Sequence, residues 1–245
     1  MQTTSLEEKI EPKNIIITGA SSGIGFEAAI ELAIKGNAVV ALARSKEKLK
    51  NLNQIVKSLN PDANFFAVEF DILNDDEQGL VDFIKQRFNK VDILINNAGA
   101  LINKPFKELT EFDMAEMYQS NVLGHFRMIK ALLPMMNTNS HIVNIGSMGG
   151  FQGSSKFAGL SIYSASKAAL ANLTECLANE LGIHGVKVNC FALGAVNTEM
   201  LRQAFPNYNS STQPNQVAKI IADFSLNWGD CVSGQIIPLT FSNPS

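Results

Sequence analysis

A tyrosine and a lysine four residues apart are the side chains of this sequence best suited to chemistry. Tyr163 and Lys167 stand in "SIYSASKAAL" (161–170), where a helix would place both on one face. An unperturbed phenol, with a pKa of about 10, is almost entirely protonated at neutral pH. An ammonium about 6 Å away, at an effective dielectric of about 20, would favour the phenolate by about 2.8 kcal/mol, or about two pKa units. The pair is therefore predicted to act as a general acid or base, although a lone pair of this spacing also arises as a half-buried aromatic beside a surface lysine.

Ser147 is the next candidate, because it follows a predicted strand in "IGSMGG" shortly before this pair. Its hydroxyl could hold a carbonyl or alcohol oxygen at the point where the phenol acts. Nucleophilic readings fit less well: "SASK" (164–167) matches the S-x-x-K motif of penicillin-recognising serine acyltransferases, but the companion S-D-N and K-T-G motifs are absent. "IGSMG" also has Ile145 where the nucleophile elbow G-x-S-x-G needs glycine. Proton transfer to an oxygen is the favoured chemistry.

The elements that must position these groups alternate between short strands and helices. Apolar runs rich in β-formers recur along the chain, and segments of helical periodicity separate most of them. This alternation predicts βαβ units, and the continuous apolar runs predict a parallel sheet covered by helices on both faces. The runs are "NIIITG", "NAVVALA", "NFFAVEF", "VDILINN", "HIVNIGS", "VKVNCFA" and "GQIIPL", and the predicted helices are roughly 24–35, 45–58, 74–89, 110–136, 163–182 and 214–226.

One α/β domain, doubly wound around seven parallel strands, is the predicted fold of all 245 residues. Residues 1–12 are expected to form an N-terminal tail and residues 193–213 a short substrate-side segment. In such sheets ligands bind beyond the carboxyl ends of the strands, near the point where the strand order reverses. The residues that follow each strand are therefore the place to look for a site.

A glycine-rich turn follows the first strand in "TGASSGIG" (18–25), with the spacing G-x3-G-x-G. Gly19, Gly23 and Gly25 permit a positive φ and a close backbone approach to a phosphate, while the next helix offers N–H groups and a positive dipole end. Tight turns use glycine for geometry as well, but the strand-turn-helix context favours a nucleotide. The segment is not a Walker loop, since no G-x4-G-K-S/T is present.

Other side chains after the strands bear on which nucleotide binds. Ala43 stands where a ribose-binding carboxylate would favour NAD, and Arg44 can meet the 2′-phosphate of NADP, although it also suits a solvated helix start. Asp71, with Ile72 beside it, could either contact adenine or cap the next helix. "NNAG" (96–99) leaves space for a flat ligand but also suits a plain loop. NADP(H) is the predicted cofactor, with NAD(H) as the alternative.

Composition argues against several other partners. The formal net charge of −3, the pI near 5.7 and the scattered basic residues disfavour nucleic-acid binding. No apolar run approaches the roughly 18 residues of a membrane span, and the polar N-terminus is unlike a signal peptide, so a cytoplasmic protein is expected. The cysteines and histidines show no metal-ligand spacing. We interpret them as buried structural thiols and as surface or satisfied core histidines, so no metal site is predicted.

Five motifs in order, each after the appropriate strand, resemble the short-chain dehydrogenase/reductase family: "TGASSGIG", "NNAG", "SNVLGHF", "NIGS" and "YSASK". The resemblance covers about residues 13–240 and implies a Rossmann fold and an NAD(P)-dependent oxidoreductase, similar to 3-oxoacyl carrier-protein reductases and carbonyl reductases. It implies Tyr163 as the general acid/base and Ser147 as the group that polarises the substrate oxygen. Lys167 would lower the pKa of the tyrosine and bind the nicotinamide ribose. Asn121 would hold a water that connects this lysine to solvent.

The resemblance also implies cofactor contacts along the whole carboxyl edge of the sheet. They are Gly19, Ser21, Gly23, Ile24, Gly25, Arg44, Asp71, Ile72, Asn97, Ala98, Gly99, Tyr163, Lys167, Gly194, Val196 and Thr198. The substrate would be a small carbonyl compound or alcohol: a 3-oxoacyl thioester, a ketone or aldehyde, a steroid-like alcohol or a sugar. Homodimers or homotetramers are expected through the helices around 110–136 and 163–182. A non-enzymatic dinucleotide-binding redox sensor on the same fold is the alternative.

The sequence departs from the family pattern on the substrate side. Leu193-Gly194 replaces the usual Pro-Gly, which puts the rigidity of that loop in doubt. The interval between Ser147 and Tyr163 is a few residues longer than is common, so the substrate shape is expected to differ from that of the best-known members. The segment 199–212 is short and the C-terminal "PLTFSNPS" lacks Asp-Gly-Gly, which suggests a small lid or help from a neighbouring subunit.

Overall fold

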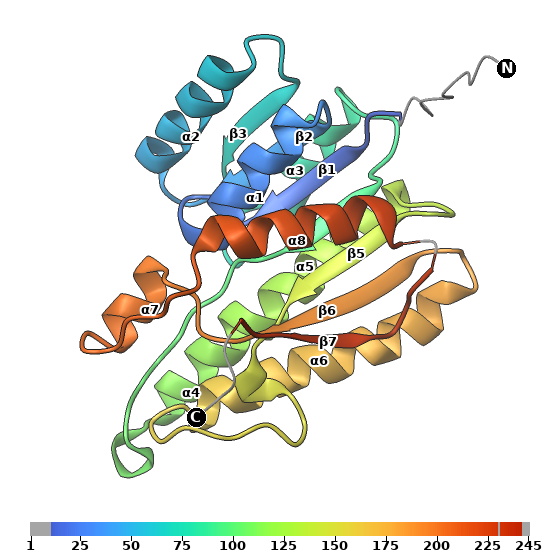
Figure 1. Ribbon diagram of the computed structural model, residues 1–245. Helices are drawn as coiled ribbons and strands as arrows, with labels where there is room; N and C mark the ends of the chain where they lie inside the picture. Colours follow the sequence, from blue (N-terminus) through green and yellow to red (C-terminus); the bar gives the residue numbers. More distant parts are fainter. Residues whose placement is uncertain (1–10, 230, 242–245) are drawn as a thin grey trace, which may run out of the picture.

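Alternate side chains of the strands enter two separate hydrophobic cores, one on each face of the sheet. In strand β1 (Asn14–Thr18), Ile15 and Ile17 pack on one side and Ile16 on the other. Strand β2 (Ala38–Ala43) is buried throughout and divides its side chains in the same way. A strand that is apolar at every position needs a covering layer on both faces. The computed structural model, which describes residues 11–229 and 231–241, shows both layers (Figure 1).

All seven strands are parallel and form one sheet with the order β3-β2-β1-β4-β5-β6-β7. The remaining strands are β3 (Phe65–Glu69), β4 (Ile93–Asn96), β5 (His141–Ile145), β6 (Lys187–Leu193) and β7 (Ile236–Leu239). The strand order reverses between β1 and β4, so the loops that follow these two strands start side by side. The predicted doubly wound seven-stranded sheet is confirmed, and the expected tail lies mostly outside the described residues.

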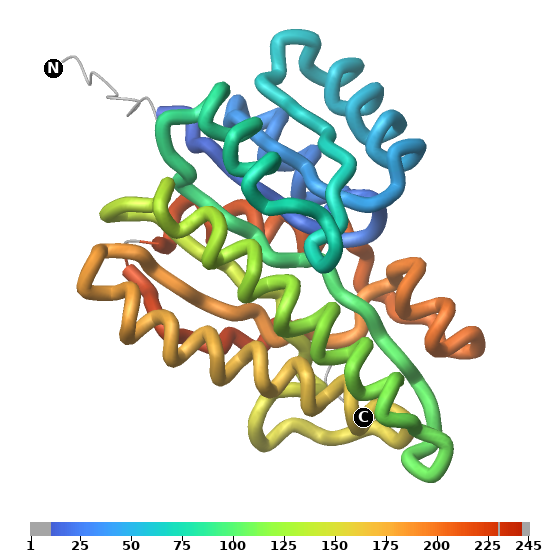
Figure 2. Tube along the Cα trace, turned by 180° about the vertical axis from the view of Figure 1, so that it is seen from behind, coloured from blue at the N-terminus to red at the C-terminus, as the bar shows by residue number. Residues whose placement is uncertain are grey.

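Helices α1 (Gly23–Ile34), α2 (Lys46–Leu59) and α8 (Pro214–Asn227) cover one face of the sheet. Helices α3 (Glu77–Lys85), α5 (Gly124–Leu132) and α6 (Ser161–Gly182) cover the other, seen from behind in Figure 2. The short helix α7 (Glu199–Ala204) stands outside both layers, at the left of Figure 1. Among the described residues, no helix is long and apolar enough to cross a membrane.

The long helix predicted over 110–136 is interrupted in the structure. Helix α4 (Glu111–Tyr118) runs into a π-helix (Gln119–Leu123) before α5 begins, and there the Gly124 N–H bonds the Gln119 carbonyl five residues back. A short 3-10 helix (Leu133–Met135) follows α5. Helix α3 also starts three residues later than predicted, because Asp76 caps it with bonds from the amides of Gln78 and Gly79.

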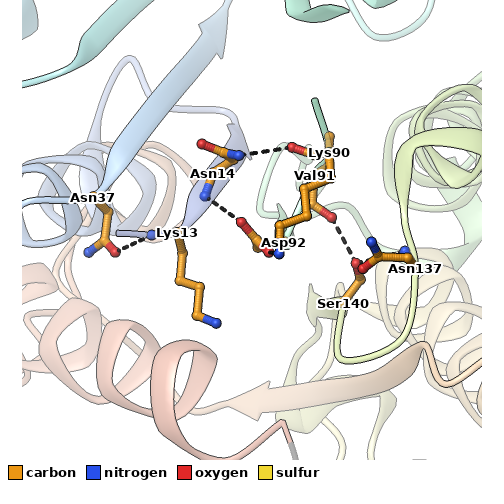
Figure 3. Close-up of polar contacts among 8 residues, drawn as sticks. All are labelled: Lys13, Asn14, Asn37, Lys90, Val91, Asp92, Asn137 and Ser140. Carbon is orange, nitrogen blue, oxygen red and sulfur yellow. Dashed lines mark hydrogen bonds and ion pairs between the residues drawn. The ribbon is translucent and has the colours of Figure 1, made fainter. Parts of the chain in front are cut away.

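Polar side chains join the amino ends of β1, β4 and β5, far from the loops that follow the strands (Figure 3). The buried carboxylate of Asp92 accepts a bond from the Asn14 amide at 2.8 Å and forms an ion pair with Lys90 at 2.7 Å. The Ser140 hydroxyl donates to the Val91 carbonyl at 2.8 Å. These bonds satisfy buried polar groups at one edge of the sheet. The sequence-predicted site residues lie at the opposite edge.

Candidate active site

The glycine-rich turn after β1 packs directly against the loop after β4. Gly19 has a φ of +69°, and a Cβ there would lie 2.7 Å from the Ala98 Cα. A Cβ on Gly25 would lie 2.3 Å from the Asn97 side-chain nitrogen. That amide donates bonds of 3.1 Å to the carbonyls of Thr18 and Gly19. The "NNAG" segment is therefore a brace for the glycine turn, and no residue larger than glycine fits at either contact.

The first turn of α1 has no side-chain cap from this chain. Ser22 precedes the helix in an extended conformation and makes no capping bond, whereas Ser45 and Asp76 cap α2 and α3. The first turn also holds no acidic residue, so its N–H groups and positive dipole end suit an anion. Thr198 lies over this turn, since a Cβ on Gly23 would be 3.1 Å from its methyl group. The arrangement fits the phosphates of a dinucleotide.

Arg44 and Asp71 lie just beyond the carboxyl ends of β2 and β3. Arg44 is exposed directly after β2. The Asp71 carboxylate accepts bonds from the Leu73 amide at 2.9 Å and from the Asn74 side chain at 3.0 Å. Burial alone would raise the pKa of Asp71, but these two bonds and the charges of Arg44 and Arg127 hold it below its usual value. Asp71 therefore fixes the turn before α3, although Asp76 and not Asp71 caps that helix.

Ser147, Tyr163 and Lys167 come together at the carboxyl end of β5. The Ser147 Oγ accepts a bond from the Gly149 amide at 3.1 Å, and the same hydroxyl is near enough to the Tyr163 phenol to act on its pKa. Lys167 is 6 % exposed, and its ammonium donates to the carbonyl of Ile145, the last residue of β5, at 2.8 Å. The tyrosine and the lysine share one face of α6, as predicted, and the structure shows that both are buried.

Small residues let the serine loop lie against α6. A Cβ on Gly149 would be 2.8 Å from the Ser164 hydroxyl, and one on Gly150 would be 2.5 Å from the Ala168 amide nitrogen. Ser166 points the other way, and its hydroxyl donates to the Tyr163 carbonyl at 2.7 Å. The small side chains between the tyrosine and the lysine thus allow this close packing.

Asn121 joins three parts of the site from within the π-helix. Its side-chain oxygen accepts a bond from the Ala100 amide at 3.0 Å. Its nitrogen donates to the Ala100 carbonyl and to the Ser166 hydroxyl, both at 3.0 Å. Gly99 must lack a side chain here, because a Cβ would lie 2.8 Å from the Asn121 oxygen and 3.4 Å from the Lys167 ammonium. The wholly buried asparagine therefore couples the loop after β4 to the helix that carries the tyrosine.

The electrostatics of the tyrosine differ from the sequence prediction. Burial raises the pKa of Tyr163, and the interaction with the Ser147 hydroxyl offsets this only in part. Burial lowers the pKa of Lys167 to about 8, while its interaction with Cys190 opposes that change. The predicted lowering of the tyrosine pKa by Lys167 is wrong for this structure, because the ammonium is directed at the Ile145 carbonyl and desolvation of the phenol prevails.

His125 is a buried group at the site that sequence reasoning missed. It is fully buried, and its Nε2 lies 2.6 Å from the Ala98 carbonyl, so the ring holds the loop after β4 in place. Within the described part of the chain, its Nδ1 has no hydrogen-bond partner. Burial first and then the Lys167 charge lower its pKa to about 3, which keeps the ring neutral. The only sequence signal was its place in "SNVLGHF", four residues after Asn121.

The other histidines and the cysteines agree only in part with the predicted roles. His141 is buried at the start of β5, and His184 is exposed after α6. Cys190 is buried beside Lys167, as predicted for a structural thiol. Cys176 and Cys231 are exposed, so their predicted burial is wrong. Within the described ranges, no group of three metal-type side chains comes together.

The substrate-side segment begins with strand rather than loop. Leu193 is the last residue of β6 and pairs with Leu239 of β7, and the Gly194 amide donates to the Leu239 carbonyl at 2.9 Å. Strand pairing therefore holds the position where the family has proline. Val196 is buried, and α7 follows Thr198, whose hydroxyl caps it.

Two contacts hold α7 across the site. The Glu199 carboxylate forms an ion pair of 2.8 Å with Lys48 in the first turn of α2. At the other end, the Asn103 side chain donates to the Ala204 carbonyl at 2.8 Å.

A hollow of about 890 Å³ lies elsewhere, between residues 133–138 and 182–186 near the amino ends of β5 and β6, and it contains none of these groups. The contacts that join loops across the molecule therefore mark the carboxyl edge as the site.

Comparison with known proteins agrees with this geometry. Residues 13–209 match the family model described as short chain dehydrogenase. The chain belongs to the short-chain dehydrogenase/reductase family. An uncharacterised oxidoreductase of Listeria innocua is 33 % identical over 227 residues, which cover 87 % of this chain and 90 % of that protein. This member of the family is therefore an NAD(P)-dependent dehydrogenase/reductase.

Solved structures of other members share its fold. A short-chain dehydrogenase of Shigella flexneri in complex with NADP is 27 % identical, with a TM-score of 0.84, covering 94 % of this chain and 98 % of that one. Levodione reductase is 25 % identical, with a TM-score of 0.82, covering 93 % of this chain and 95 % of that one. The Rossmann-type fold predicted from the order of the motifs is confirmed.

Proposed function

We propose that this chain is an NADP(H)-dependent oxidoreductase that interconverts a carbonyl compound and an alcohol, with Tyr163 as the general acid/base. One observation carries the proposal: the buried phenol interacts with the Ser147 hydroxyl and lies one helical turn from the buried Lys167. A proton donor and a second hydroxyl thus converge where a substrate oxygen can receive both. The family relationship supports the same assignment.

In the reducing direction, the carbonyl carbon would receive a hydride that NADPH would supply when bound. The Tyr163 hydroxyl donates its proton to the carbonyl oxygen, and the Ser147 hydroxyl polarises that oxygen with a hydrogen bond. The raised pKa of Tyr163 keeps the phenol protonated at neutral pH, which suits a proton donor. One carbonyl, one NADPH and one proton give one alcohol and NADP⁺, and oxidation reverses both transfers. Lys167 is proposed to bind the nicotinamide ribose. Asn121 is proposed to hold a water molecule that connects this lysine to solvent.

NADP(H) is proposed as the preferred cofactor because of the residues that follow β2. The Ala43 methyl cannot accept a bond from a ribose hydroxyl, whereas the exposed Arg44 guanidinium can meet a 2′-phosphate. The complex of the Shigella flexneri relative with NADP supports this choice. The residues proposed to contact the cofactor are Gly19, Ser21, Gly23, Ile24, Gly25, Arg44, Asp71, Ile72, Asn97, Ala98, Gly99, Tyr163, Lys167, Gly194, Val196 and Thr198.

A homodimer or homotetramer is proposed as the working form. Phe112, Leu123 and Phe126 expose 76 %, 45 % and 43 % of their surface along α4, the π-helix and α5. Apolar side chains that gather on an outer helical surface favour association. Cytoplasmic location stays a prediction from the sequence.

Replacement of the tyrosine tests the assignment. Tyr163→Phe removes only the hydroxyl, so we expect NADPH to raise the melting temperature as it does for the wild type, while turnover of every accepted carbonyl falls by more than ~100-fold. Turnover is followed by the loss of NADPH absorbance with a panel of ketones, aldehydes and alcohols. Unchanged turnover in this variant would contradict the role of Tyr163.

Removal of the arginine tests the cofactor preference separately. Arg44→Ala is expected to weaken NADPH binding and leave NADH binding nearly unchanged, because only NADPH carries the 2′-phosphate. Lys57, which lies in the last turn of α2, provides the control Lys57→Ala. Equal use of NADH and NADPH by the wild type would refute the preference.

A further inference from the structure

The ring of Tyr163 lies in a cluster of apolar side chains drawn from several parts of the chain. Met117 of α4 and Leu160, just before α6, are buried against it. Further apolar side chains pack around these three, and they are Ala100, Leu101, Ile102, Ile162 and Phe205. The last of them directly follows α7. A substrate that brings its oxygen to the phenol would therefore meet this apolar cluster beside the Ser147 hydroxyl.

The charged side chains of the three segments nearest this cluster already bind other groups of the protein. These segments are residues 100–104, 151–162 and 197–205, which the structure describes in full, and two of their four charged side chains form ion pairs. Lys104 pairs with Asp113 at 2.9 Å, and Glu199 pairs with Lys48 at 2.8 Å. Neither is left to neutralise a charge on a substrate.

The two remaining charged side chains of these segments bind polar groups of the protein instead. The Lys156 ammonium donates to the Phe151 carbonyl and to the Ser154 hydroxyl, each at 2.7 Å. The Arg202 guanidinium donates to the side-chain oxygen of Asn197 at 2.8 Å. A carboxylate or phosphate on a substrate would have to displace one of these bonds to find a cation.

These surroundings discriminate strongly between classes of substrate. A charged or polyhydroxylated molecule would lose hydration against the apolar cluster without gaining matching bonds, which is costly. An apolar group of the substrate would gain about 25 cal/mol for each Å² of surface it buries there. The raised pKa of Tyr163, caused by burial, reflects the same poorly solvated surroundings.

We propose that the substrate is a neutral carbonyl compound, or the corresponding alcohol, that carries an apolar group beside the reacting carbon, and that Phe205 selects for this group. The inference rests on the proposed function and narrows the substrate class of the same site. It excludes sugars from the classes that the sequence left open, and it also predicts that short 3-oxo acids in their ionised form are poor substrates.

Two matched pairs of compounds test the substrate class in the full chain with NADPH. Methyl acetoacetate and acetoacetate differ in charge, and 2-butanone and hydroxyacetone differ by a methyl in place of a hydroxyl. We expect kcat/KM to be at least ~10-fold higher for methyl acetoacetate and for 2-butanone. Equal or higher values for acetoacetate or hydroxyacetone would overturn the proposal.

Variants of one phenylalanine test the selecting residue. Phe205→Ala is expected to raise KM for 4-phenyl-2-butanone about 10-fold, with a smaller effect on kcat and no change in the melting shift caused by NADPH. Phe205→Leu keeps an apolar contact and should retain most of the activity. Phe106, which is 79 % exposed and outside the cluster, provides the matched control Phe106→Ala.

The outcomes separate this inference from the proposed function. If Phe205→Ala lowers activity no more than Phe106→Ala does, the selecting role is wrong, whereas the reductase assignment stands. If NADPH binds but no carbonyl of the panel is reduced, the proposed function fails, and the substrate inference fails with it.

Discussion

Gly25→Ala provides a sharp test of the packing between the glycine turn and the loop after β4. Alanine is about 1 kcal/mol better than glycine inside a helix, so helix propensity alone predicts a more stable protein. The structure predicts the opposite, because the new Cβ would lie 2.3 Å from the Asn97 side-chain nitrogen and 2.6 Å from the Gly19 carbonyl oxygen. The carbonyl belongs to the backbone and cannot move away without distorting the turn.

The expected loss follows from the bonds and the overlap. Displacing Asn97 breaks its two bonds to the carbonyls of Thr18 and Gly19, at about 1 kcal/mol each, and the overlap itself costs about 1–3 kcal/mol. After the gain in propensity is subtracted, the free energy of unfolding should fall by about 2–4 kcal/mol, which lowers the melting temperature by about 5–15 °C in a chain of this length.

Urea and thermal unfolding, followed by far-UV circular dichroism, measure this loss. Gly79→Ala is the matched control, since Gly79 also lies in a helix but a Cβ there meets only the Asp76 carboxylate at an ordinary 3.7 Å. That control should leave the protein as stable as the wild type or up to about 1 kcal/mol more stable. If Gly25→Ala unfolds at or above the wild-type temperature, the close approach described here is wrong.

Three further predictions concern buried or capping groups. The pKa of Lys167 falls from 10.5 to about 8 on folding, so the buried ammonium destabilises the wild type at pH 7. After the lost bond to the Ile145 carbonyl is subtracted, Lys167→Met should stabilise the protein by about 2 kcal/mol at this pH. Urea unfolding should show this advantage of the variant shrink between pH 8 and about 10.5, because in that range the unfolded wild type binds the proton and the folded wild type does not. Because the pKa of His125 falls from 6.5 to about 3 on folding, the free energy of unfolding of the wild type should decrease as the pH falls below 6.5. By pH 4.5 it should have decreased by about 3 kcal/mol more than that of His125→Gln, and equal decreases in both proteins would contradict this. Thr110→Ala removes the side-chain cap that accepts the Asp113 amide at 3.1 Å, and calorimetry should record a cost of about 1 kcal/mol.

The sheet and its reversal could be predicted because they depend on local sequence. Buried strands need apolar residues at every position, and the turn at the reversal needs glycine at Gly19 and Gly25, so both leave clear patterns. The convergence of Ser147, Tyr163 and Lys167 followed from the same patterns, since groups after parallel strands meet at one edge of the sheet.

Other features depend on packing that the local sequence does not encode. The π-helix sequence "QSNVL" contains no proline or glycine that would predict an interruption, so nothing in the sequence indicated the break within 110–136. Helix α7 has six residues, too few for a periodic pattern, and Thr198, which caps it, was assigned only as a cofactor contact. The predicted direction of the Tyr163 pKa change was wrong, because the effect of Lys167 depends on where its ammonium is directed. The ammonium is directed at the Ile145 carbonyl, a contact that the local sequence does not reveal.

The π-helix between α4 and α5 marks a place where the chain can change its length by one residue. It holds one more residue in a turn than an α-helix does, so deletion of one residue there would let the segment close as an α-helix while α5 keeps its orientation relative to α4. Met128, Ile129 and Leu132 would then stay in the hydrophobic core that they fill. A single-residue deletion within residues 119–123 should therefore disturb α5 far less than one within residues 124–132, which would rotate the rest of the helix by about 100°.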